Sequence, residues 1–144
     1  MGGKLTHMSE FSVRAVHSDW RASDEEVYET LKRATAPLDR AWARLKKARR
    51  IGIKFNQDKR PQDLILYEGH RQQLVDDSVV RATLRLLREN TQAEVFSVDC
   101  AFYRHYTGFT GDVTQIRPVL QEFGVEHIEG SEDVVWADVP GGGF

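Results

Sequence analysis

The chain has 144 residues, of which 40% are hydrophobic and 29% charged, and this matches a single globular domain with a sizeable core. Its 20 Lys and Arg residues nearly balance 22 Asp and Glu residues, and the formal net charge of -2 gives no general attraction for nucleic acid or an anionic membrane. The single cysteine, Cys100, excludes an intramolecular disulfide and any cysteine-only zinc or iron–sulfur site within this chain.

The sequence carries no membrane or secretion signal. No apolar run approaches the roughly 20 residues that a membrane span needs, and the first residues lack the apolar core of a signal peptide. We therefore expect a cytoplasmic protein. Residues 1–10 are expected to form a flexible leader, and residues 11–144 a single α/β domain.

The first third of the chain predicts one strand followed by two helices. Apolar and polar residues alternate over residues 11–17, which is typical of a strand. Ser23 and Glu26 have the spacing of a capping box and mark the start of a helix. Pro37 should end that helix and occupy the first turn of a second one, in which Leu38 to Leu45 carry an apolar stripe.

The remaining elements alternate between strands and helices. Strands are predicted at 51–55, 94–99, 125–128 and 134–139, with a further short strand at 64–67. One helix should begin after Asp76 or Asp77 and end near Asn90. Another should begin around Ile116 or Arg117, or else kink at Pro118, and should stop at Gly124. No internal repeat is found.

This order favours an α/β fold with a mostly parallel, Rossmann-like sheet of about 4–5 strands and helices on its faces. A complete doubly wound domain usually continues beyond such a series of elements. We therefore expect the chain to be one module of a longer architecture, or to need a partner that covers an edge of the sheet.

Polar side chains follow two of the predicted strands. Lys54, Asn56 and Asp58 come at the exit of the first, and Asp99 ends the second. In open α/β sheets, ligands bind outside the carboxyl ends of the strands. An ammonium and an amide there can hold a carboxylate or phosphate group. In the alternative interpretation, Lys54 simply pairs with Asp99, and Asn56 caps the turn.

Two long loops add basic side chains at the same side of the predicted sheet. His70 and Arg71 lie on the first loop, and Arg104 and His105 on the second, so both loops can contribute to an anion-binding mouth. Asp99 and His105 are candidates for acid/base catalysis. Cys100 is expected to be an inert thiol, and the five histidines have no metal-ligand spacing, so no metal site is expected.

The pattern of strand ends and helices resembles the family called domain of unknown function 362, in which a strand ending in Ile-Lys-Pro-Asn is followed by a loop, an amphipathic helix and a strand with an acidic end. The matching stretches here are Ile53-Lys54-Phe55-Asn56, residues 79–88, residues 95–99, residues 123–125 and residues 139–142. Phe55 replaces the usual proline. The resemblance implies the N-terminal α/β part of that family. Some members also carry iron–sulfur modules, but this chain lacks the cysteines for one, so no iron–sulfur cluster is expected.

Three functions follow as hypotheses. The first is a binding module that holds a small anionic ligand with Lys54, Asn56, Asp99 and the two loops, acting with another domain, a subunit or a second copy. The second is a stand-alone enzyme with Asp99 or a loop histidine as acid/base group. The third is a protein-interaction or oligomerisation module without a ligand.

Overall fold

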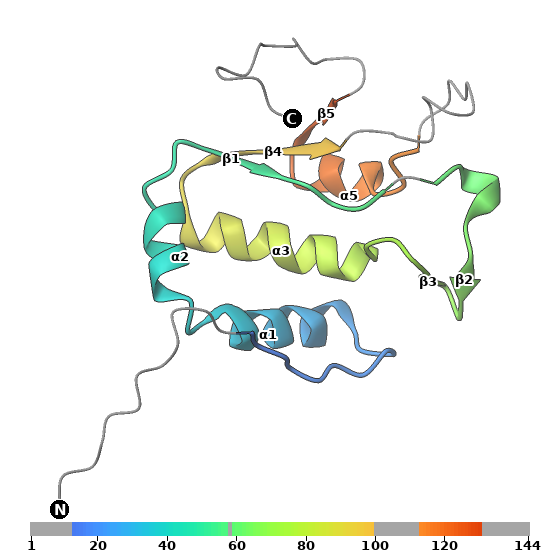
Figure 1. Cartoon of the computed structure of the whole chain (residues 1–144), viewed down its shortest axis with the longest axis horizontal. Coiled ribbons are helices and arrows are strands. Elements are labelled where there is room, and N and C mark those ends of the chain that lie inside the picture. The colour runs from blue at the N-terminus through green and yellow to red at the C-terminus, as the bar shows by residue number, and fades with distance from the viewer. Residues whose placement is uncertain (1–12, 58, 100–112, 131–144) are drawn as a thin grey trace, which may run out of the picture.

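The computed structural model of the chain describes residues 13–57, 59–99 and 113–130. Figure 1 shows its helices and strands. In order they are α1 (Asp24–Thr35), α2 (Asp39–Leu45), β1 (Arg50–Ile53), the 3-10 turn η1 (Pro61–Asp63), β2 (Leu66–Tyr67), β3 (His70–Arg71), α3 (Asp77–Asn90), β4 (Glu94–Asp99), α5 (Arg117–Glu122) and β5 (Glu126–Glu129).

A three-stranded parallel sheet forms the upper layer of the molecule in Figure 1. The strand order is β1-β4-β5, with Ile51 opposite Val95 and Ser97 opposite His127. The predicted α/β class and the parallel direction of these strands are therefore confirmed. The described sheet has three strands rather than 4–5, and the predicted strand at 134–139 lies outside the described residues.

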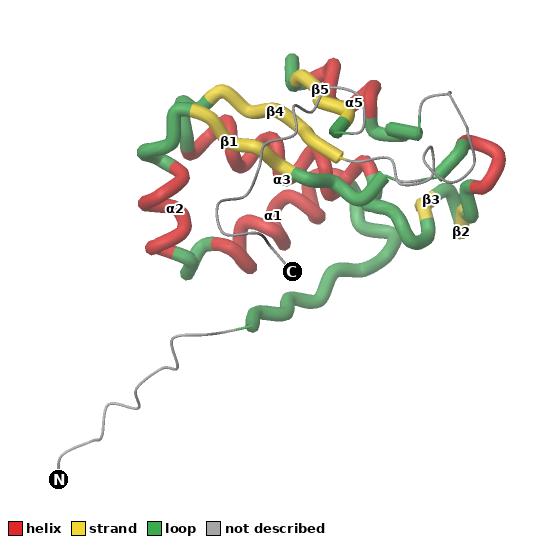
Figure 2. Tube along the Cα trace, turned by 45° about the horizontal axis from the view of Figure 1, so that its top comes forward, coloured by secondary structure: helices red, strands yellow, loops and turns green. Residues whose placement is uncertain are grey.

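Helices α3 and α5 cover one face of this sheet, and α1 packs on the opposite side of α3, so that α1 forms a third layer (Figures 1 and 2). Tyr28 of α1 packs with Ala82 and Leu86 of α3 in a small second core. The sequence suggested helices on both faces of the sheet. Among the described elements, the helices that contact the sheet lie on a single face.

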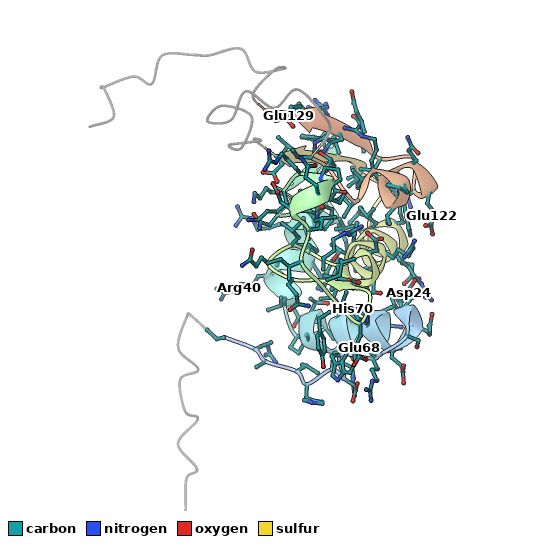
Figure 3. All side chains as sticks on the ribbon, turned by 90° about the vertical axis from the view of Figure 1, so that its right-hand side faces the viewer. Asp24, Arg40, Glu68, His70, Glu122 and Glu129 are labelled. Carbon is teal, nitrogen blue, oxygen red and sulfur yellow. The ribbon has the colours of Figure 1, made fainter. Side chains whose placement is uncertain are left out.

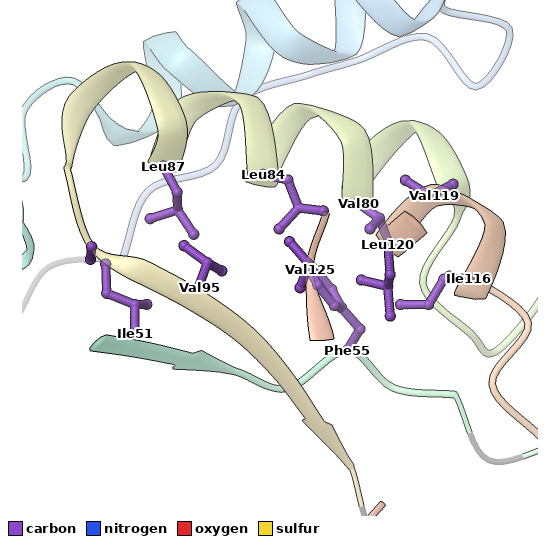
Figure 4. Close-up of a cluster of buried hydrophobic side chains, with 11 residues drawn as sticks. Ile51, Phe55, Val80, Leu84, Leu87, Val95, Ile116, Val119, Leu120 and Val125 are labelled. Carbon is purple, nitrogen blue, oxygen red and sulfur yellow. The ribbon is translucent and has the colours of Figure 1, made fainter. Parts of the chain in front are cut away.

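The main core lies between the sheet and α3. Ile51 and Val95 point from neighbouring strands toward Leu84 and Leu87 of α3 (Figure 4). The most deeply buried apolar side chains come from α3, α5 and the segment before α5; they are Leu84, Ile116, Leu120, Val80, Val113 and Val119. This face of α3 carries the apolar residues that its 3.6-residue period predicted.

Side-chain caps fix where the two long helices begin. Ser23 caps α1, and both bonds of the predicted capping box form with Glu26. Asp76 caps α3 by accepting a hydrogen bond from the Ser78 N–H at 3.1 Å. Helix α5 starts at Arg117 with Pro118 in its first turn, so the kinked alternative is not needed.

Two predictions near the N-terminus are wrong. The strand predicted at 11–17 is absent over its described part, where residues 13–17 have no regular structure and Val13 is 99% exposed. This segment runs past α1, on the far side of the helices from the sheet (Figure 1), so it has no strand to pair with. Pro37 precedes the second helix, which begins at Asp39, instead of lying in its first turn.

A small hairpin occupies the long connection after β1. Strands β2 and β3 pair antiparallel, with Leu66 opposite Arg71 and Tyr67 opposite His70. The two turn residues, Glu68 and Gly69, have φ of 45° and 87°, which is the requirement of a type I′ turn. The sequence predicted the first strand of this hairpin but not its partner.

None of the helices in the described part of the chain is both long and apolar enough to cross a bilayer.

Replacement of Leu84 by Ala tests the core. Leu84 is 1% exposed between α3 and the sheet, so Leu84→Ala should lower the free energy of unfolding by about 2–5 kcal/mol. Val79→Ala on the same helix is the control, because Val79 is 40% exposed and its truncation should change stability by less than about 0.5 kcal/mol. Urea unfolding measures both. Equal effects of the two substitutions would contradict the assigned core.

Candidate functional site

The parallel register brings Lys54 and Asp99 to one edge of the sheet. Lys54 follows β1 directly and Asp99 ends β4, and both strands run in the same direction. The Lys54 Nζ lies 3.6 Å from the Asp99 Oδ1. The Lys54 side chain is 56% exposed, whereas that of Asp99 is only 10% exposed. The result is an accessible cation beside an enclosed carboxylate.

Asn56 joins this pair from the chain that leaves β1. Its Oδ1 accepts a hydrogen bond from the Lys54 Nζ at 2.8 Å, and its Nδ2 donates to the Gln73 carbonyl at 3.1 Å. The structure thus assembles Lys54, Asn56 and Asp99, as the sequence suggested. The contacts of the alternative interpretation also form, because Lys54 pairs with Asp99 and Asn56 anchors the loop.

Gln57 is a member of the cluster that sequence reasoning missed. It is 2% exposed, its backbone N–H donates to the Asp99 Oδ2 at 3.2 Å, and its Nε2 donates to the Val75 carbonyl at 3.0 Å. Its Oε1 is buried and has no hydrogen-bond partner in the described part of the chain. A buried acceptor without a donor costs about 1–3 kcal/mol, so this atom needs a donor such as an ordered water.

A line of buried polar side chains runs toward the same edge on β4 and β5. The His127 ring lies between the Ser97 Oγ at 3.2 Å and the Thr114 Oγ1 at 3.1 Å. Glu129, two residues further along β5, is 8% exposed and lies opposite Asp99. His127 lies on β5, an outer strand of the described sheet. The alternation of His127 and Glu129 around Ile128 was the available indication that both point to the covered face.

His70 and Arg71 do not join this cluster. Figure 3 shows His70 and Glu68 beside the helical layer of α1, while Glu129 lies at the sheet. Arg71 makes a bidentate ion pair with Asp77 and also donates to the Gln115 carbonyl at 3.1 Å. The second contact connects the hairpin to the segment before α5. The other predicted loop residues, Arg104 and His105, lie outside the described residues, as does Cys100.

His70 instead pairs with the residue that caps α3. Its Nδ1 lies 3.3 Å from the Asp76 Oδ2. Partial burial alone would raise the pKa of the Asp76 carboxyl, but the hydrogen bonds from the Ser78 N–H and from His70 outweigh it. The pKa of Asp76 therefore lies below its ordinary value of 3.8.

Over residues 13–57, 59–99 and 113–130, no three His, Cys, Asp or Glu side chains are grouped so that they could hold a metal ion. The site described above is a set of hydrogen-bonding and charged groups at the end of the sheet.

Comparison with known proteins gave no relatives: no family model, no curated protein and no solved structure matches this chain.

The lowered pKa of Asp76 predicts how stability depends on pH. A carboxyl whose folded-state pKa is depressed stabilises the fold above its unfolded pKa, and that contribution disappears as the pH falls through the folded value. Acidification from pH 5 to pH 2 should therefore destabilise the wild type more than Asp76→Asn, which keeps a good capping residue without the titration. Urea unfolding across this pH range measures the difference.

The matched control is Asp39→Asn at the first turn of α2, because Asp39 makes no ion pair or hydrogen bond with the described residues. Its acid dependence should follow the wild type. If Asp76→Asn also follows the wild type at every pH, the assigned contacts of Asp76 are wrong.

Proposed function

We propose that this chain is a Rossmann-like α/β module that binds a small anionic ligand at the carboxyl edge of its parallel sheet. The observation that supports this proposal is the meeting of Lys54, Asn56 and Asp99 at that edge. Ligands of open α/β sheets occupy this position because the strand ends and the loops that follow them leave a crevice there.

Lys54 supplies the attraction for an anion. An ammonium group has three N–H donors, and one of them is used by the Asn56 Oδ1. The Asp99 Oδ1, at 3.6 Å, balances the charge of Lys54 but is beyond hydrogen-bonding distance. The exposed ammonium therefore retains donors for a carboxylate or phosphate oxygen.

The class of ligand follows from the exposed cation. A small molecule with a carboxylate or phosphate group would place that group against Lys54, beside Asn56 and Asp99. Small hydroxy acids, amino acids and phosphate belong to this class.

The proposal includes a partner for this module. The outer strands of the described sheet, β1 and β5, each lack a partner strand on one side within the described residues. Such edges are normally covered, which supports a module that works with another domain, a subunit or a second copy. We also propose a relationship to the domain of unknown function 362 family, on the matching sequence stretches alone. A cytoplasmic location is proposed on the lack of a secretion signal in the given sequence.

Lys54→Met tests the ligand site directly. Small hydroxy acids and amino acids, with phosphate alongside, should be screened by thermal shift. A ligand at 100 times its dissociation constant stabilises the fold by about 2.7 kcal/mol, which corresponds to a shift of several degrees. This shift should disappear in Lys54→Met and persist in Lys47→Met, an exposed lysine after α2. A blank screen, or a shift that survives Lys54→Met, would refute the proposal.

The hairpin supports a second candidate, a protein-interaction module. Ile65, Leu66 and Tyr67 are 57%, 57% and 58% exposed, and Trp20 lies against Tyr67 with ring centroids 5.5 Å apart. Neighbouring exposed apolar side chains of this kind mark contact surfaces for other proteins.

If this surface joins two copies of the chain, light scattering should show a dimer that forms with rising concentration. Leu66→Lys should shift that equilibrium to the monomer, whereas Val13→Lys, at a fully exposed site away from the hairpin, should not. A wild type that stays monomeric at all concentrations would rule out self-association through the hairpin.

A further inference from the structure

A cavity of about 380 Å³ lies on the other side of α3 from the sheet. It is bounded by α1, the start of α3, the hairpin and the segment before α1. Its walls are mainly apolar side chains, contributed by Val16, Val27, Leu31, Ala34 and Val79. This volume lies within the range of small-molecule sites, which combine apolar walls with a few placed polar groups.

The cavity wall also contains aromatic and polar side chains, Trp20 among them. The His70 ring meets the Trp20 ring edge to face at 6.2 Å, and Asp19 precedes Trp20 in the chain. Asp19, His70 and Asp76 all line the cavity. The Trp20 and His70 rings are therefore neighbours in a wall that also carries two carboxylates.

The charge of the lining is negative. Among the described residues that line the cavity there are two carboxylates and no Lys or Arg side chain. The guanidinium of Arg21 lies outside this lining, where it stacks over the Trp20 ring at 4.3 Å and pairs with Glu68 at 3.6 Å. A negative, partly apolar cavity favours a cationic guest and disfavours an anion.

The Asp76 carboxylate is also held in place. Its Oδ1 accepts from the Ser78 N–H at 3.1 Å, and its Oδ2 faces the His70 Nδ1 at 3.3 Å. These contacts keep the carboxylate ionised and fixed in orientation. The His70 ring, oriented by the same contact, has its Nε2 without a partner among the described residues, so it can serve as a second polar anchor.

We propose that this cavity is a binding site for a small aromatic amine. The ring would lie among Leu31, Ala34 and Val79 beside Trp20, and the ammonium group would lie next to Asp76 and His70. This site is separate from the strand-edge cluster of Lys54 and Asp99 and has the opposite preference for charge.

A matched pair of probes tests the preference. Phenethylamine and phenylacetate share a ring and differ in the sign of their charge. Calorimetric titration of the full chain should show binding of phenethylamine, and phenylacetate should bind at least about tenfold more weakly. Equal affinity for the two probes, or no binding of phenethylamine, would overturn the proposal.

Four variants test the location. Ala34→Phe fills the cavity and should abolish binding, whereas Ala41→Phe, on α2 and outside this cavity, should leave it unchanged.

Asp76→Asn keeps the cap of α3 but removes the charge, and should weaken phenethylamine binding about tenfold. Because Asn preserves the cap, this variant tests the site even if Ala34→Phe fails to fold. Unchanged binding in Asp76→Asn would overturn the proposal. Lys54→Met should have no effect, which separates this site from the strand-edge site.

Discussion

The parallel, in-register pairing of β1 with β4 is the constraint on which the rest of this structure depends. Two parallel neighbours need a crossover, and α3 supplies it by packing Val80, Leu84 and Leu87 against the sheet. Because the strands run in the same direction, the residues that leave them must meet at one edge. Lys54 and Asp99 are close for this reason, although they are far apart in the chain.

The polar groups at that edge also hold the following loop in place. Asn56 and Gln57 donate hydrogen bonds to the carbonyls of Gln73 and Val75, immediately before the cap of α3. The segment that ends the hairpin is thereby attached to the end of the sheet. The Val75 carbonyl that Gln57 contacts directly precedes Asp76, which lines the cavity, so this short segment connects the two candidate sites.

Much of the fold could be predicted because its determinants are local. The capping box of Ser23 and Glu26 and the apolar stripe of α3 each specify their helix within a few residues. The prediction of a strand at 11–17 was wrong because alternation of apolar and polar residues shows only that a segment can form a strand. A strand also needs a neighbouring strand to pair with, and this segment lies on the far side of α1 from the sheet. The contacts of His70 and Arg71 could not be predicted in this way. His70 and Arg71 reach Asp76 and Asp77 only because the loop folds back on itself, and the contact of Arg71 with the Gln115 carbonyl joins segments 44 residues apart.

The most direct test of the account is the direction of β1 relative to β4 in solution. Nuclear Overhauser contacts between backbone protons of the two strands report it without reference to any ligand. The structure predicts contacts of Ile51 with Val95 and of Ile53 with Ser97, in steps that rise together along both strands. Contacts that instead link the start of one strand to the end of the other would separate Lys54 from Asp99 and contradict the proposed site.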